Sequence, residues 1–313
     1  MEYRNLGESG LQVSVAGLGC NNFGRRIDKA KTADVVAAAL DLGVTLFDTA
    51  DVYGPGGQSE EFLGAALGKR RADVIIATKF ANPMGEGPLL RGASRRYIFS
   101  AVEASLRRLN TDWIDLYQVH IPDAHTPPEE TMRALDDLVR AGKVRYIGCS
   151  NYSGWQIADA QWTARAHHLT PFVSAQNQYS LLDRRIEREV VPAARRFGLS
   201  ILPWGPLASG FLSGKYRPGE PPPAGTRLAA AGPMAERALN AENFAVLEKL
   251  ESFAALRGRT VLDVAIGWLA TKPWIASVIN GATSPEQMEQ NVRAADYRLT
   301  PEEMAELDQI TRR

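Results

Sequence analysis

Residues 44–54 read VTLFDTADVYG, an apolar, strand-like run that ends in the carboxylate Asp48 and is followed five residues later by Tyr53. A carboxylate at the end of a buried strand needs hydrogen bonds or a cation, because an unpaired buried charge is costly or takes up a proton. The run therefore predicts a buried strand and a partner for Asp48 elsewhere in the chain.

Seven further apolar runs, rich in β-branched residues, have the same character. Each is short and continuous, as is typical of parallel strands buried on both faces. The eight expected strands are Ser14–Gly19, Val44–Ala50, Val74–Phe80, Trp113–His120, Val144–Ser150, Val173–Tyr179, Leu199–Leu207 and Ala276–Ala282.

Segments of helical period alternate with these strands. TPPE at residues 126–129 and TPEE at residues 300–303 each predict a capping box with proline at the first helical position. Eight strand–helix units favour an α/β fold of the (β/α)8 TIM-barrel type over a doubly wound sheet. The dinucleotide fingerprint of the doubly wound fold is incomplete, because residues 17–22, GLGCNN, lack its third glycine.

The expected domain organisation is a single (β/α)8 barrel covering residues 1–313. Glu2–Val13 predicts a hairpin that caps the barrel, since two short apolar segments flank a turn-rich GESG. A long insertion is expected after the seventh strand, between Leu207 and Ala276, with helices around Phe244–Leu256 and Val261–Leu269.

Composition excludes several classes of partner. The chain has 36 basic and 36 acidic residues and no net charge, so neither nucleic acid nor anionic lipid is expected to bind by bulk attraction. The N-terminus lacks the apolar core of a signal peptide, and the longest uncharged stretch, Leu199–Gly214, is broken by proline and glycine. Two cysteines outside any metal-binding spacing fit a reducing compartment, so we expect a cytoplasmic protein without a membrane segment or a metal.

The chemistry of a barrel is expected at the carboxyl ends of its strands, where the loops surround one mouth. The second, third and fourth expected strands end near Asp48, Lys79 and His120, and Tyr53 lies on the loop just past Asp48. These four side chains are therefore expected to face the same mouth.

Together they predict an acid. A tyrosine hydroxyl has a pKa of about 10, so a cation must stabilise its phenolate before it can readily give up a proton at neutral pH. Lys79 can supply that cation, Asp48 can keep Lys79 charged, and a nearby His120 can orient a carbonyl oxygen. Such a group suits protonation of the oxyanion that forms when hydride reaches a carbonyl carbon.

Asp48, Lys79 and His120, taken alone, each also have a non-catalytic interpretation or a different one. Asp48 could only close a strand, and Lys79 could reach solvent along an apolar surface. His120 and His125 could form a metal pair, although no third ligand is evident. Residues 148–152, GCSNY, lack the final glycine of a hydrolase nucleophile elbow.

The sequence closely resembles the aldo-keto reductase family, nicotinamide-dependent oxidoreductases built on a (β/α)8 barrel. The resemblance runs almost end to end, and the branch it resembles includes potassium-channel β subunits and bacterial aldehyde and sugar reductases. It rests on RNLGESGLQVS (4–14), FDTA (47–50) with Tyr53-Gly54, TK (78–79), GCSN (148–151), Gln176, WGPL (204–207), SGKY (213–216) and GATSPEQ (281–287).

The resemblance implies a catalytic tetrad of Asp48, Tyr53, Lys79 and His120, where channel subunits usually have asparagine at the fourth position. It also implies a cofactor site in which Trp204 stacks on the nicotinamide ring, although the indole could instead be core packing. The other expected contacts are Cys20, Asn21, Asp48, Ser150, Asn151, Gln176, Gly205, Pro206, Leu207, Ala208, Ser209, Lys215, Arg227, Gly281, Ala282, Thr283, Gln287, Gln290 and Asn291.

The expected activity is reversible reduction of a small-molecule aldehyde or ketone to an alcohol. Lys215 and Arg227 favour NADP (NADPH) as cofactor, because a 2'-phosphate needs positive charge, while NAD is possible because Thr283 stands where many members carry a basic residue. Gln287 could serve a capping box, SPEQ at 284–287, in place of the adenine. The alternative function is an NADP-sensing regulatory subunit with little turnover; no oligomeric state is indicated.

Overall fold

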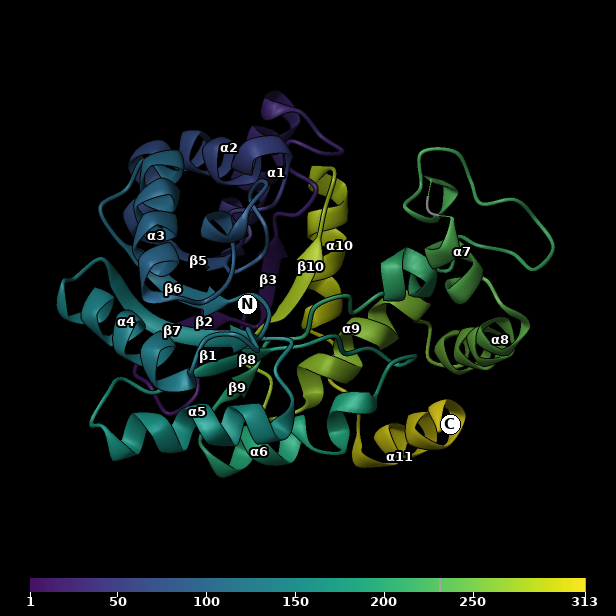
Figure 1. The fold of residues 1–313 in the computed structure, drawn as a ribbon. Coiled ribbons are helices and arrows are strands. Elements are labelled where there is room, and N and C mark those ends of the chain that lie inside the picture. The colour runs from purple at the N-terminus through teal and green to yellow at the C-terminus, as the bar shows by residue number, and fades with distance from the viewer. Residues whose placement is uncertain (231, 313) are drawn as a thin grey trace.

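The computed structural model describes residues 1–230 and 232–312 (Figure 1). Within them, eight parallel strands form one sheet in the order β10-β3-β4-β5-β6-β7-β8-β9. The strands are β3 (Ala16–Gly19), β4 (Leu46–Asp48), β5 (Ile75–Phe80), β6 (Ile114–Val119), β7 (Val144–Ser150), β8 (Ser174–Gln176), β9 (Ser200–Ile201) and β10 (Val278–Gly281). Parallel bridges Ile201↔Ile275 and Trp204↔Ile279 join the two edges of the sheet, so the (β/α)8 barrel is confirmed.

Helices connect the strands and surround the barrel (Figure 1). The helices between strands include α1 (Lys29–Asp41), α2 (Gln58–Leu67), α3 (Arg95–Leu109), α4 (Pro128–Arg140), α5 (Gly154–Ala166), α6 (Val190–Arg196) and α9 (Val261–Thr271). After the last strand come α10 (Pro285–Ala295) and α11 (Pro301–Thr311). None of the helices in the described part of the chain has both the length and the apolar character to cross a bilayer.

Several strands are shorter than their apolar runs. The expected Leu199–Leu207 contributes only Ser200–Ile201 to the ladder, because Pro203 and Pro206 have no amide hydrogen to donate. β4 ends at Asp48, as expected, so the carboxylate stands where the strand meets the loop.

The two predicted capping boxes have different outcomes. Thr300 caps α11 and forms the full box with Glu303, as predicted. The box at residues 126–129 is wrong: Pro127 is the N-cap of α4, without a side-chain bond. The helix begins one residue later than expected, because the Glu130 and Thr131 amides donate to the Pro127 carbonyl oxygen. Thr126 therefore precedes the N-cap, and its hydroxyl donates to Asp123 Oδ2 at 2.7 Å.

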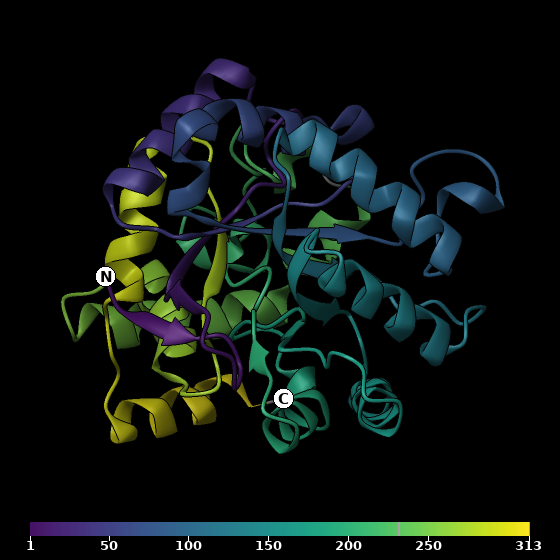
Figure 2. The same cartoon turned by 90° about the vertical axis from the view of Figure 1, so that its left-hand side faces the viewer.

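The predicted hairpin is present, with β1 (Tyr3–Asn5) antiparallel to β2 (Gln12–Ser14), and it appears in purple beside the N-terminus in Figure 2. Leu6 and Val13 pack into a cluster with side chains from the barrel strands, so the hairpin covers one end of the barrel. The Arg4 guanidinium donates to the carbonyl oxygens of Ala270, Lys272 and Ile275 at 2.6, 3.2 and 2.8 Å. These bonds fix the hairpin to the segment that precedes β10.

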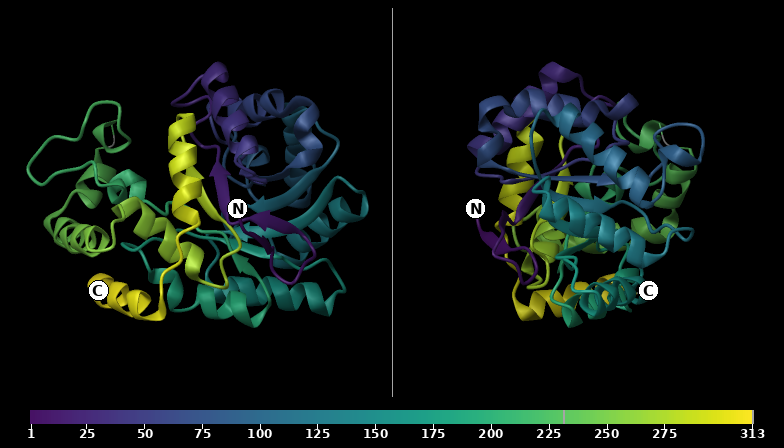
Figure 3. Two further views of the ribbon diagram at one scale, coloured as in Figure 1. Left: turned by 180° about the vertical axis from the view of Figure 1, so that it is seen from behind. Right: turned by 60° about the vertical axis from the view of Figure 1, so that its left-hand side comes forward.

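The expected insertion after the seventh strand is also present. It contains the 3-10 helices Ala208–Ser213 and Leu228–Ala230, then α7 (Pro233–Ala238) and α8 (Ala241–Ala255). The predicted helices correspond to α8 and α9, but α9 belongs to the ring around the barrel. In the left view of Figure 3, the rest of the insertion, in green, projects from the left side of the barrel.

Candidate functional site

The partner predicted for Asp48 is Lys79, which points into the barrel from β5. Lys79 Nζ donates to Asp48 Oδ2 at 2.6 Å and to the Thr49 carbonyl oxygen at 2.9 Å. The Lys79 side chain has no exposure to solvent, and that of Asp48 is 4% exposed. Parallel pairing of β4 with β5 brings the two residues together at the carboxyl ends of the strands.

Tyr53 and His120 lie beside this ion pair. Lys79 Nζ is 5.0 Å from the centroid of the Tyr53 ring. The Tyr53 and His120 rings meet edge to face, with centroids 5.6 Å apart. Asp48, Tyr53 and His120 line one cleft of about 740 Å³, and Lys79 lies behind them. The structure thus brings the four predicted catalytic residues together.

Burial and charge set the protonation of this group. Burial lowers the pKa of Lys79, but Asp48 and Tyr53 together outweigh burial, so the pKa is raised and the ammonium stays charged. Burial raises the pKa of Tyr53, and Lys79 opposes only part of that rise. Tyr53 therefore carries its proton at neutral pH, and Lys79 reduces the cost of a phenolate without bringing its pKa below the ordinary value.

His120 is a neutral imidazole at physiological pH. Burial, with the Lys79 cation nearby, lowers its pKa to about 3. Its Nδ1 is buried and has no hydrogen-bond partner within residues 1–230 and 232–312. A neutral ring has one nitrogen donor and one acceptor, so His120 can bind a polar group that enters the cleft.

Two glutamines hold the other oxygen of Asp48. Gln176 Nε2 donates to Asp48 Oδ1 at 2.7 Å, and Gln118 Nε2 donates to the same atom at 3.3 Å. Sequence reasoning named Gln176 and missed Gln118. The available signal was alternation along the strand, because Gln118 precedes His120 by two residues and so faces the same side of β6.

The far end of the cleft carries positive charge. Arg26, Lys215 and Arg227 line it, and none of the three forms an ion pair in the described part of the chain. Burial, followed by repulsion from Arg26, lowers the pKa of both Lys215 and Arg227. Cations without counter-ions fit phosphate groups, so the residues present suit a phosphorylated dinucleotide.

The loop after β9 borders the same cleft. Ala208 and Ser209 have φ of +46° and +60°, a left-handed conformation that costs energy in residues other than glycine, and Gly210 continues the series. The Ala208 and Gly210 amides donate to the carbonyl oxygens of Gly205 and Leu207 at 2.9 Å each, so the loop is held by its own backbone bonds. At the start of the loop, Trp204 Nε1 donates to Asn151 Oδ1 at 3.2 Å, which fixes the indole over the cleft.

Most predicted cofactor contacts lie on this cleft. Those that line it are Asn21, Asp48, Ser150, Asn151, Gln176, Trp204, Gly205, Pro206, Leu207, Ser209, Lys215, Arg227, Gly281, Thr283, Gln287, Gln290 and Asn291. Cys20, Ala208 and Ala282 lie outside the lining, and the Cys20 thiol is fully buried, where burial raises its pKa. The lining residues that sequence reasoning missed include Asn22, Arg26, Gln178, Thr226, Leu262 and Asn280.

Ser284 is the N-cap of α10. Gln287, however, does not complete a capping box. Its Oε1 accepts hydrogen bonds from the Thr283 backbone amide and hydroxyl at 2.9 and 3.0 Å. Gln287 therefore fixes the loop at the mouth of the cleft and also lines it.

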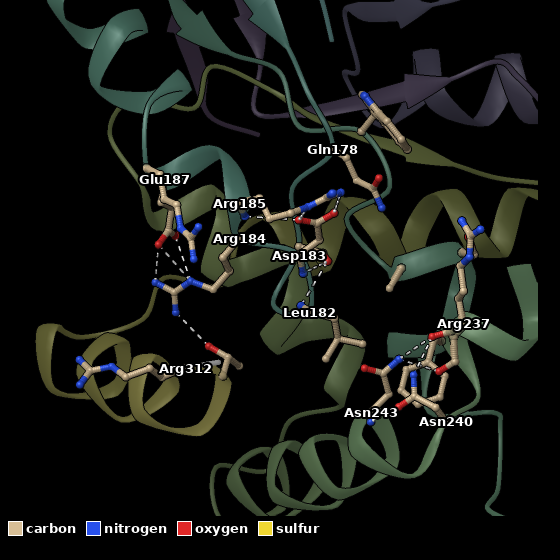
Figure 4. A pocket seen from close by; sticks show the side chains of 18 of the residues that line it. Gln178, Leu182, Asp183, Arg184, Arg185, Glu187, Arg237, Asn240, Asn243 and Arg312 are labelled. Atoms are coloured by element: carbon tan, nitrogen blue, oxygen red, sulfur yellow. Dashed lines mark hydrogen bonds and ion pairs between the residues drawn. The ribbon is translucent and has the colours of Figure 1, made fainter. Parts of the chain in front are cut away.

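A second cavity, of about 940 Å³, shares Gln178, Trp204 and Ser209 with the cleft (Figure 4). Two of its five lining arginines, Arg184 and Arg185, bind acids. Arg184 binds Glu187 at 2.8 Å and Asp308 at 2.7 Å.

Comparison with known proteins agrees with this site. The profile of the Aldo/keto reductase family matches residues 16–312. The chain belongs to this family. As a member it is a carbonyl-reducing oxidoreductase, and the family as a whole uses nicotinamide cofactors.

Its relatives include proteins named as oxidoreductases and as a channel subunit. The chain is 38% identical to the uncharacterized oxidoreductase YrpG of Bacillus subtilis (strain 168), over 99% of this chain and 96% of the relative. It is 37% identical to a "probable voltage-gated potassium channel subunit beta" of Oryza sativa subsp. japonica, over the same shares. It is 34% identical to versiconal hemiacetal acetate reductase of Aspergillus parasiticus, again over 99% and 96%.

Proposed function

We propose that this aldo/keto reductase uses NADP(H) to reduce an aldehyde or ketone reversibly, with Tyr53 as the general acid. The observation that carries the proposal is the buried Lys79–Asp48 pair beside Tyr53, in a cleft whose other end holds cations without counter-ions. The pair can stabilise the phenolate that remains after proton transfer. The free cations match phosphates.

His120, Tyr53 and Lys79 each have a separate role in the reaction. His120, neutral and with a buried nitrogen lacking a partner in the described chain, holds the carbonyl oxygen near the Tyr53 hydroxyl. The reduced nicotinamide, when bound, supplies a hydride to the carbonyl carbon. As the C=O π bond breaks, the oxygen takes the Tyr53 proton and the alcohol forms. The Lys79 ammonium then stabilises the phenolate until it is reprotonated.

Cofactor residues follow the length of the cleft. Trp204, anchored by Asn151, offers an aromatic face, and Gln176 offers an amide to the carboxamide of the nicotinamide. Lys215 and Arg227 hold phosphate. Two cations on the cleft without acidic partners favour NADP(H) over NAD(H), because only the former carries the additional 2'-phosphate.

Tyr53→Phe tests the acid. Loss of the proton donor is expected to lower turnover by about two decades or more, while the Kd for NADPH stays within about twofold. Tyr117→Phe is the matched control: Tyr117 is buried against Phe80, and its hydroxyl has no partner within the described residues. Its turnover should equal that of the wild type. Near-normal reduction by Tyr53→Phe would refute the acid assignment.

A second candidate is an NADP-sensing regulatory subunit, supported by the 37% identity to a protein named as a channel β subunit. Oxidation of NADPH should be followed with a panel of aldehydes and ketones. Turnover of any carbonyl at a rate that depends on Tyr53 supports the enzyme. Tight NADPH binding without turnover of any of them supports the sensor.

A further inference from the structure

Gln118 lies in the interior of the barrel, behind the cleft. It is fully buried and does not line the cleft, whereas Gln176, from β8, does. Gln118 Nε2 donates to Asp48 Oδ1 at 3.3 Å, and Gln118 Oε1 accepts from Gln176 Nε2 at 3.4 Å. Asp48, Gln118 and Gln176 therefore form a closed set of hydrogen bonds under the cleft floor.

These bonds fix the direction of both amides. The NH2 group of Gln176 has two hydrogens, and its nitrogen is the donor to both Asp48 Oδ1 and Gln118 Oε1. Turning the Gln118 amide by half a turn would set its oxygen against the Asp48 carboxylate and its NH2 against that of Gln176. Turning the Gln176 amide would likewise set an oxygen against the carboxylate. Each reversal replaces attraction by repulsion in a dry site, where such contacts are costly.

In this arrangement Gln176 Nε2 donates only to protein atoms, Asp48 Oδ1 and Gln118 Oε1. Gln176 Oε1 therefore remains as the acceptor for a ligand. Asp48, held at Oδ1 by two amides, has Oδ2 free for Lys79, which binds it at 2.6 Å. One buried glutamine thus contacts both the residue that meets the cofactor amide and the carboxylate that holds the catalytic ammonium.

We propose that Gln118 is a positioning residue that orients Gln176 toward the nicotinamide carboxamide and holds Asp48 toward Lys79. This inference rests on the proposed function. Gln118 touches neither the cofactor nor the substrate, so it acts only through Gln176 and Asp48.

A double-mutant cycle tests that route. Gln118→Leu should raise the Kd for NADPH roughly tenfold, the effect of losing an oriented hydrogen bond, and Gln176→Leu should raise it at least as much. Gln118→Leu/Gln176→Leu should match Gln176→Leu alone within about twofold, because Gln118 has nothing left to orient. Factors that simply multiply would overturn the proposal.

Gln118→Glu adds a pH signature. While protonated, the introduced acid can donate to Asp48 and accept from Gln176, and once ionised it repels Asp48. The loss of kcat/KM relative to the wild type should therefore grow with rising pH. The loss in Gln118→Leu should be the same at every pH. A pH-independent loss in Gln118→Glu would contradict the proposed contacts.

Gln161→Leu is the matched control. Gln161, on α5, is also a buried glutamine, but it bonds the backbone of Phe172, which precedes β8. The Gln161→Leu variant should have a lower unfolding free energy than the wild type. Its Kd for NADPH and the pH dependence of its kcat/KM should equal those of the wild type. If Gln118→Leu shows only that behaviour, Gln118 is structural and the proposal fails.

The same cycle, measured by urea unfolding of the protein without cofactor, separates this inference from the proposed function. Non-additive unfolding free energies for Gln118→Leu and Gln176→Leu are expected from their shared bond to Asp48. A wild type that neither binds NADPH nor reduces carbonyls would refute the proposed function, whatever the cycle gives. Additive unfolding free energies would refute the contacts on which the inference rests.

Discussion

Two cavities meet at Trp204, and both are rich in cations, but their charges are arranged differently. In the second cavity (Figure 4), Arg184 binds Glu187 and Asp308, and Arg185 binds Asp183 at 2.7 Å. In the cleft, Lys215 and Arg227 have no acid partner within residues 1–230 and 232–312. The number of cations therefore does not distinguish an anion site from a structural network; the presence of acids does.

The pKa shifts follow the same division. Burial lowers the pKa of Arg184, but Glu187 and Asp308 outweigh it, and the pKa is raised. For Lys215 and Arg227, burial and Arg26 both lower the pKa. In the second cavity, Arg184 and Arg185 are bound by acids that line the same cavity. Lys215 and Arg227 have no such acid, which leaves a deficit of negative charge that a phosphorylated ligand can fill.

The largest expected effect is on turnover, and it distinguishes the Lys79–Asp48 pair of the cleft from the Arg184 ion pairs of the second cavity. Lys79→Met should lower turnover by about two decades or more, because Tyr53 loses the cation that stabilises its phenolate. Arg184→Met should leave kcat unchanged and lower the unfolding free energy by about 2 kcal/mol, since the acids it binds are partly exposed to water. Steady-state kinetics and urea unfolding measure the two.

Lys79→Met leaves Asp48 buried without its cation, so it can also unfold the barrel. Asp48→Asn/Lys79→Met removes both charges and should restore stability without restoring turnover. Recovery of turnover in this double variant would remove the Lys79–Asp48 pair from the mechanism.

An intermediate effect is expected from the free cations. Lys215→Ala and Arg227→Ala should each raise the KM for NADPH about tenfold, because each loses a charge-assisted hydrogen bond to phosphate. The KM for NADH should change by less than about threefold. Arg185→Ala, a paired arginine of the second cavity, is the control and should alter neither KM. Equal losses with NADPH and NADH would place these cations away from the 2'-phosphate.

The smallest effect concerns the wall of the second cavity. Thr300 caps α11, which carries Asp308 and Thr311 into that wall. Thr300→Ala should lower the unfolding free energy by about 1 kcal/mol, the usual contribution of a helix cap. The Kd for NADPH should not change, and a weaker Kd would mean that the two cavities are coupled through Trp204.

The sequence was sufficient for the barrel and for the group around Asp48, because both follow from local rules. Short apolar runs predicted the strands, and the rule for strand ends predicted that Asp48, Lys79 and His120 meet. Gln118 was missed because it lies inside an apolar run: its spacing from His120 indicates which way it faces, but its bonds to Asp48 and Gln176 appear only in the folded chain.

Features that depend on contacts between distant parts of the chain could not be predicted from the sequence. The Thr126 cap was wrong because α4 begins one residue later, with Pro127 as its N-cap, and Thr126 bonds to Asp123 outside the helix. The second cavity is built from the loop after β8, from α7 and α8, and from α11, which no local pattern brings together. Arg26, far along the chain from Lys215, joins the same cleft only after the barrel closes.

The closure of the barrel also has a consequence for the order in which the chain can fold. β3 pairs with β10, and Arg4 donates to the carbonyl oxygen of Ile275, 271 residues further along. A ribosome releases the N-terminus first, so the free edge of β3 and the apolar side chains of Leu6 and Val13 stay unmatched until nearly the whole chain has emerged. The barrel therefore closes late. Until it closes, the unpaired edge of β3 is open to pairing with another chain, which is a route to aggregation.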